Sequence, residues 1–211
     1  DQAVPSFTGC TFINNYVTDT DNGRSGGAVK IEGASSITDL QNAINFEQCK
    51  FIGNYVKVKD NAYGGAVNAN RNTVFKNCLF VKNGAISGFG ETNANESNHS
   101  EGGAIYSGSE RDGTGVVTVI SNCTFDRNYV DVRTNSGAPY GTELFYGWTP
   151  SASNVPMKAY VFNTIITGSY RLRGGADYTE NESSKLFYSH SDINKLYADY
   201  SAIEGSTDQP W

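Results

Sequence analysis

The sequence predicts an all-β fold, a right-handed parallel β-helix (solenoid) of about five to seven coils with loop insertions and an aromatic-rich C-terminal end. Two alternating motifs and their variable spacing support this prediction. The first motif, Phe-x-x-Cys-x-Phe-x-x-Asn, spans residues 7–15, 46–54 and 75–83, and recurs at 120–128 with Ile for the first Phe. The second, Gly-Gly-Ala followed by Val or Ile, begins at Gly26, Gly64 and Gly102. Each unit therefore supplies a short apolar strand, a turn and a strand opened by a glycine pair.

The spacing of the copies separates a coiled sheet from a helical repeat. The second Phe of the motif recurs at Phe12, Phe51, Phe80 and Phe125, at intervals of 39, 29 and 45 residues. A two-helix repeat keeps its length because the unit has fixed dimensions, whereas a coiled sheet tolerates insertions between strands. We therefore expect one bare coil in the shortest interval and added loops or an extra half-turn in the longer ones.

Strand alternation predicts the interior of the solenoid. Side chains two residues apart on a strand point to the same face, so each motif places its Cys and second Phe together. We expect the four Phe side chains to stack as an interior ladder. Buried free thiols fit the repeated Cys position better than disulfides between adjacent coils. The four cysteines are Cys10, Cys49, Cys78 and Cys123.

The polar and glycine positions of the motifs predict the turns. The motif Asn closes each strand, where its amide can bond to the turn backbone and to the equivalent Asn of the next coil. These residues are Asn15, Asn54, Asn83 and Asn128. The glycine pairs let the backbone bend sharply beneath the next coil. The residues after them should alternate, with Val29, Val67 and Ile105 inward and Lys30, Asn68 and Tyr106 outward.

Length and composition fit one domain. We expect residues 1–211 to form a single β-helix domain, with regular repeats over 1–145 and degenerate terminal coils or a cap over 146–211. The chain opens without a leader or a recognisable cap, which fits a mature chain or a segment of a longer solenoid. No apolar run is long enough for a membrane span. A net charge of −6 and a pI near 4.9 disfavour a nucleic-acid partner.

The repeats carry a family resemblance over about residues 7–145. Gly9-Cys10-Thr11-Phe12 and Asn122-Cys123-Thr124-Phe125, each followed by the motif Asn, together with the Gly-Gly-Ala motifs, resemble two known repeats. These are the FxxN and GGA[ILV] repeats of the chlamydial polymorphic outer membrane proteins and of other bacterial extracellular right-handed parallel β-helix repeat proteins. The resemblance implies secretion, an extracellular or cell-surface location, and adhesion. Related β-helices include polysaccharide lyases and hydrolases, so the fold alone does not select the function.

We therefore expect a non-catalytic extracellular or cell-surface β-helix, an adhesin segment or structural stalk, with a glycan or cell-surface protein as partner. The alternative is a carbohydrate-active enzyme, either a polysaccharide lyase or a glycoside hydrolase, or a glycan-binding module. Such an enzyme needs grouped carboxylates, or a base beside acidic calcium ligands, on one exterior face. Asp126 and Arg127 are the nearest approach to a catalytic pair, and a surface ion pair is the competing interpretation.

Three segments are candidates for ligand binding. The C-terminal aromatic residues could stack on sugar rings, or they could pack in a cap or in the core. The candidates are Tyr146, Trp148, Tyr170 and Tyr178. Asp19 and Asp21 place oxygen donors on alternate residues, as in a Ca²⁺ loop, but an ordinary acidic turn fits equally because no acidic residue closes the loop. We expect no other cofactor. The polar insertion 87–101 could carry recognition or be disordered.

Overall fold

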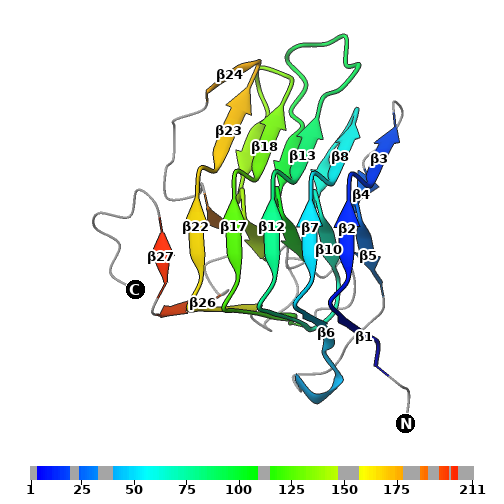
Figure 1. Cartoon of the computed structure of the whole chain (residues 1–211). Helices are drawn as coiled ribbons and strands as arrows, with labels where there is room; N and C mark the ends of the chain where they lie inside the picture. The colour runs from blue at the N-terminus through cyan, green and yellow to red at the C-terminus, as the bar shows by residue number, and fades with distance from the viewer. Residues whose placement is uncertain are drawn as a thin grey trace.

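The computed structural model describes residues 4–19, 24–32, 40–108, 115–146, 157–177, 186–189, 195–199 and 201–203. These residues form short β-strands and one 3₁₀ turn, η1 (Leu40–Asn42), and the strands stack into five sheets that we name A to E (Figure 1). Within the described ranges, no helix is long and apolar enough to cross a membrane.

The strands of each sheet come from successive turns of the chain. Sheet A contains β1 (Ser6–Thr8), β6 (Ile44–Glu47), β11 (Thr73–Lys76), β16 (Val117–Ser121), β21 (Lys158–Phe162) and β26 (Lys195–Asp199). Sheet B contains β2 (Thr11–Ile13), β7 (Lys50–Ile52), β12 (Leu79–Val81), β17 (Thr124–Asp126), β22 (Ile165–Thr167) and β27 (Ala202–Ile203). Sheet C contains β3 (Tyr16–Asp19), β8 (Tyr55–Val58), β13 (Gly84–Ser87), β18 (Tyr129–Val132), β23 (Tyr170–Arg173) and the antiparallel β24 (Ala176–Asp177). Sheet D contains β4 (Arg24–Ser25), β9 (Ala62–Tyr63), β14 (His99–Glu101) and β19 (Ala138–Tyr140), and sheet E contains β5 (Val29–Ile31), β10 (Val67–Ala69), β15 (Ile105–Ser107), β20 (Leu144–Tyr146) and β25 (Phe187–Tyr188).

The chain passes through the sheets in the order A to E and then returns to A, which confirms the predicted all-β architecture of stacked parallel sheets. Equivalent motif residues are in register, as Phe51 pairs with Phe80 and Phe80 with Phe125. The first motif forms the strands of sheets A and B, and the glycine motif opens those of sheet E. Sheets C and D come from the residues between the motifs, where the sequence predicts a turn in the shortest interval and loops or an extra half-turn in the longer ones; the structure has these strands in the shortest interval too, as β8 and β9.

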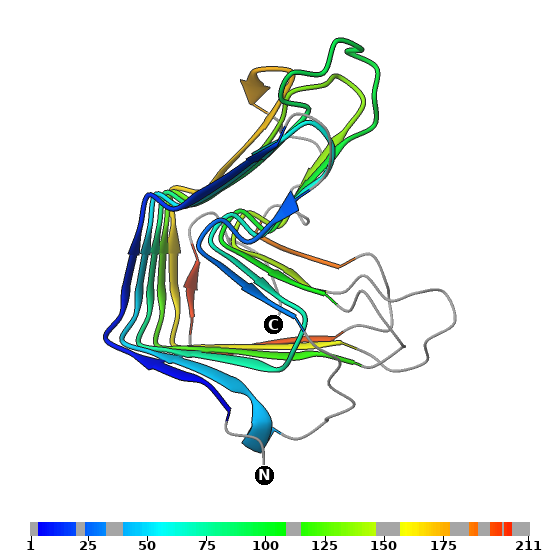
Figure 2. The same cartoon turned by 90° about the vertical axis from the view of Figure 1, so that its right-hand side faces the viewer.

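Sheets A, B and E enclose the main core (Figure 2). The predicted ladder from Phe12 to Phe125 is confirmed, with ring centroids 4.7–4.8 Å apart and planes 4° from parallel. A second stack, Phe7, Phe46 and Phe75, lies on sheet A. The motif cysteines adjoin these stacks, and all four are free. Three of them are buried, whereas Cys10, on the first turn, is half-buried.

Sheets C and D form a projection from this body, which we call the wing (Figure 2). A small separate core fills it, made of Val56, Val58, Ala62, Ala85 and Val130. Inward and outward positions alternate along each sheet C strand, so burying the valines forces the first residue of each strand onto the outer face.

An asparagine ladder holds the corner between sheets B and C. The Oδ1 atom of Asn83 accepts hydrogen bonds from the backbone N and the Nδ2 of Asn54, both at 3.0 Å. The same pair of bonds joins Asn15 to Asn54 and Asn83 to Asn128. This confirms the predicted structural role, because each side-chain amide hydrogen-bonds to backbone groups that would otherwise be buried and unpaired at the corner.

The glycine pairs also have the predicted role. Gly64 has a φ of 64°, and a Cβ added to Gly65 would lie 2.1 Å from the carbonyl oxygen of Gly103 in the next turn. Only glycine permits that approach. The following positions alternate as expected, although the outward residues Asn68 and Tyr106 are themselves buried.

Candidate functional site

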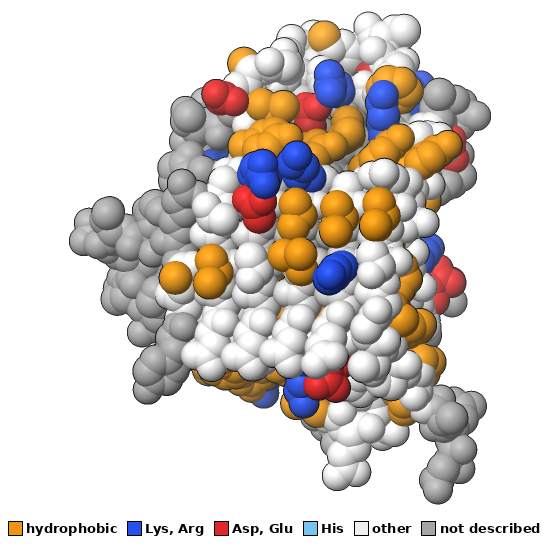
Figure 3. Space-filling model, in the orientation of Figure 1, with side chains coloured by type: hydrophobic (Ala, Val, Ile, Leu, Met, Phe, Trp, Pro, Cys, Tyr) orange, Lys and Arg blue, Asp and Glu red, His pale blue; other side chains and the backbone are white. Residues whose placement is uncertain are grey.

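The outer face of sheet C carries an aromatic row. Tyr16, Tyr55, Tyr129 and Tyr170 are the first residues of their strands and occupy equivalent register positions, interrupted only by Gly84 of β13. We call these four side chains the tyrosine row. Figure 3 shows hydrophobic side chains in bands over this face of the wing and over the adjoining ends of sheet B.

The rings of the tyrosine row are stacked with an offset. Tyr16 and Tyr55 have centroids 5.3 Å apart and planes 8° from parallel, and Tyr129 and Tyr170 have values of 5.1 Å and 3°. These separations exceed the contact distance between stacked carbon atoms, about 3.5 Å, so neighbouring rings overlap only in part. Each pair therefore leaves some aromatic face uncovered.

Gly84 joins the two pairs into one surface. A Cβ added to Gly84 would lie 2.1 Å from Cζ of Tyr129, which means that the Tyr129 ring leans over β13 and fills the space where a side chain would stand. Burial raises the pKa of Tyr129 to about 12 and also raises the pKa of Tyr170. Both phenols therefore stay neutral near pH ~7 and can donate hydrogen bonds.

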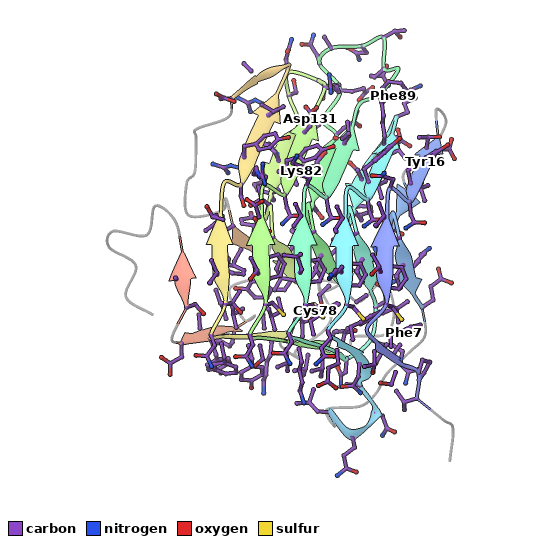
Figure 4. The ribbon with its side chains drawn as sticks, viewed as in Figure 1. Phe7, Tyr16, Cys78, Lys82, Phe89 and Asp131 are labelled. Atoms are coloured by element: carbon purple, nitrogen blue, oxygen red, sulfur yellow. The ribbon has the colours of Figure 1, made fainter. Side chains whose placement is uncertain are left out.

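The ends of the row are the most accessible. Tyr16 is 61% exposed and Tyr170 is 40% exposed, whereas Tyr55 and Tyr129 are half-buried. Figure 4 shows Tyr16 at one end of sheet C, with Phe89 near the tip of the wing and Lys82 near the sheet B corner. A ligand lying along the row would meet aromatic surface over several neighbouring strands.

An open hollow of about 500 Å³ lies beside the row, lined by Thr18, Asp19, Tyr55, Lys57 and Phe89. Phe89 belongs to the insertion after β13, which is anchored on the wing because Phe89 N donates to the Val58 carbonyl at 2.9 Å. The Lys57 ammonium lies 3.7 Å from the Phe89 ring centroid. The hollow thus combines aromatic walls with a cation, a carboxylate and a hydroxyl group.

Asp126 and Arg127 lie at the corner between sheets B and C. Arg127 is two residues before Tyr129 of the tyrosine row. The Arg127 Nη2 atom is 2.5 Å from Asp126 Oδ2, and Nε donates to the same oxygen at 2.8 Å. The Asp126 carboxylate raises the pKa of the Arg127 guanidinium. This geometry fits a surface ion pair. That was the alternative to a catalytic role for these two residues.

The remaining predicted site residues are dispersed. Tyr146 packs in the main core and is 9% exposed, so inward alternation on β20 removes it from any stacking surface. Tyr170 belongs to the tyrosine row, and Asp19 lines the hollow. Trp148, Tyr178 and Asp21 lie outside the described residues.

Sequence reasoning missed three members of the tyrosine row. Tyr16, Tyr55 and Tyr129 each follow a motif Asn directly, and this Asn-Tyr dipeptide was the available signal. The candidate Ca²⁺ site stays a prediction, and the described ranges contain no group of three or more His, Cys, Asp or Glu placed to hold a metal ion.

A second hollow, which is mainly apolar, lies on the outer face of sheet A. It has a volume of about 310 Å³ and is lined by Leu40, Val117, Val119, Lys158, Tyr160 and Phe162. Tyr197 stacks on Tyr160 with centroids 4.9 Å apart and is 45% exposed. This pair resembles those of the tyrosine row in exposure and stacking but lies on a different sheet.

Comparison with known proteins returned no matching family model, no matching curated protein and no matching solved structure.

Proposed function

We propose that the protein is a non-catalytic extracellular or cell-surface adhesin segment that binds a glycan on the outer face of sheet C. The fold in this proposal is a right-handed parallel β-helix of about five to seven coils. One observation carries the proposal: a row of partly exposed, offset tyrosine rings on a rigid sheet beside a polar hollow.

Sugars match this surface chemically. Their C–H faces pack on aromatic rings, while their hydroxyl groups need nearby donors and acceptors. The tyrosine row supplies the rings, and Thr18, Asp19 and the phenol hydroxyls supply polar partners. Because β8, β13 and β18 in the middle of sheet C are held by parallel pairing on both sides, little backbone ordering remains there to oppose binding.

The ion pair favours binding over turnover. Glycoside hydrolysis commonly uses two carboxyl groups that flank the scissile bond. Asp126 is the one acidic residue at the outward positions of β2, β7, β12, β17 and β22, and it is already paired with Arg127. The alternative, a carbohydrate-active enzyme, would need a second carboxyl group opposite Asp126 that no outward position of these strands supplies.

A glycan array tests the proposal with matched variants. Tyr16→Ala and Tyr170→Ala remove the two accessible ends of the row and should weaken binding, whereas Tyr197→Ala removes an exposed stacked tyrosine from sheet A and should not. Equal effects of the three variants, or no glycan binding at all, would refute the proposed site. Reducing-end and unsaturated-product assays complete the test, because cleavage lost in Asp126→Ala would establish the enzyme instead.

A further inference from the structure

The corner between sheets B and C contains a backbone position that disfavours most residues. The equivalent residues of five successive turns all have positive φ: Asn14 at 52°, Gly53 at 63°, Lys82 at 54°, Arg127 at 54° and Gly168 at 65°. Glycine adopts this conformation freely and Asn tolerates it, whereas longer side chains do so at a cost. Two long cations therefore occupy a position where Gly or Asn would be more stable.

Strained residues of this kind are a reason to look for function. Lys82 and Arg127 lie on adjacent turns, because the Lys82 backbone N donates to the carbonyl of Asp126 at 2.9 Å. Both side chains are exposed. In the described part of the chain, no carboxylate lies within ion-pair distance of Lys82. Figure 3 shows Lys and Arg side chains gathered between the apolar bands of sheets B and C.

Cations also lie on the other side of the tyrosine row. Lys57 lines the hollow, and Arg133 pairs with Asp131 at 2.6 Å. Near the row lie four cations, Lys57, Lys82, Arg127 and Arg133, and three acids, Asp19, Asp126 and Asp131, while the adjacent Lys59 pairs with Glu91 and adds no net charge. This excess of positive charge contrasts with the net charge of −6 for the chain.

We propose that the glycan bound by the tyrosine row is anionic, a polysaccharide carrying carboxylate or sulfate groups that Lys82 and Arg127 bind. This inference rests on the proposed function and specifies its ligand class. The sugar rings would lie along the row, and their anionic groups would reach the adjacent corner. Lys82 acts as a point charge, while Arg127 retains N–H donors beyond the two that contact Asp126.

The test removes charge without disturbing the fold. Lys82→Asn suits the corner backbone, because Asn14 already adopts the same conformation there. Lys82→Arg keeps the charge. Lys76→Asn, at an exposed position of sheet A in the same turn, is the matched control. Arg127→Asn is a secondary variant because it also releases the Asp126 carboxylate.

Polygalacturonate, dextran sulfate and neutral dextran are the probes, each measured at low and moderate salt. Lys82→Asn should weaken binding to the preferred anionic polymer about tenfold, as expected for losing a charged hydrogen bond. Lys76→Asn should bind like the unmodified protein, and Lys82→Arg should recover most of the affinity that Lys82→Asn loses, because it restores the charge. Tighter binding of polygalacturonate would identify carboxylate recognition, and tighter binding of dextran sulfate would identify sulfate recognition.

Two results would overturn the inference. If Lys82→Asn and Lys76→Asn weaken binding equally, the attraction is diffuse and not located at the corner. If dextran binds as tightly as the anionic polymers and depends on Tyr16 alone, the ligand is neutral, so the inference fails while the proposed function stands. Failure to bind any glycan would overturn both.

Discussion

Glu143 accepts a hydrogen bond from Asn128, with Asn128 Nδ2 lying 2.8 Å from Glu143 Oε2. The asparagine ladder ends at Asn128, because Ser169 occupies the next equivalent position. The Ser169 hydroxyl donates to the other carboxyl oxygen of Glu143. Glu143 itself stands where the glycine motif has Ala66 and Ala104 in earlier turns. A long buried side chain thus fills the space that the short serine leaves.

The burial of the Glu143 carboxyl group should make stability depend on pH. Burial raises the pKa of Glu143 from 4.5 to about 7, so the folded protein holds this proton more tightly than the unfolded chain. The stabilisation is therefore complete below about pH 4.5 and is lost as pH rises toward 7, by roughly 3 kcal/mol. Urea unfolding across this range measures it. Glu143→Gln keeps the shape of the side chain but cannot titrate, so the free energy of unfolding of this variant should change less with pH. Identical pH profiles for the variant and the unmodified protein would contradict the prediction.

The aromatic ladder should contribute strongly to stability. Phe80 is fully buried between Phe51 and Phe125, so Phe80→Ala should lower the free energy of unfolding by about 3–5 kcal/mol. Phe12 lies at the end of the stack and is half-buried, so Phe12→Ala should cost less. Denaturant unfolding of the two variants checks this order, and an equal loss would mean that the first turn is better covered than its exposure indicates.

The cysteines should react according to their burial. Protein denatured without reductant should take up four alkyl groups, because all four thiols are free. In the folded protein Cys10 should react first with the alkylating reagent. The three buried thiols, Cys49, Cys78 and Cys123, should react slowly, and burial also raises the pKa of Cys49. Mass spectrometry over time measures the order. Fewer than four groups on the denatured chain would reveal a disulfide.

Gly84 should matter more for the tyrosine row than for folding. In Gly84→Ala the new Cβ would overlap the far end of the Tyr129 ring, which can move away because it lies on the outer face. We expect glycan affinity to fall while the urea midpoint changes little. Gly65→Ala is the contrasting variant, since its Cβ would meet the Gly103 carbonyl and destabilise the fold. Unchanged glycan binding in Gly84→Ala would show that the Tyr129 ring is not part of the site.

The sequence by itself determined the solenoid, its interior and its corners. Phe51, Cys49 and Asn54 could be placed because each recurs at the same motif position, and strand alternation then assigns the face. The tertiary structure decided the wing, the tyrosine row and the contact between Glu143 and Asn128. The wing and that contact depend on which residues of successive turns become neighbours, and insertions of different length hide this register. Three tyrosines of the row directly follow the motif Asn, so only their place on an outer sheet face came from the structure. Tyr146, for which the sequence left open a sugar-stacking surface or a place in a cap or core, lies in the core, because it pairs with Ser107 at an inward position of sheet E.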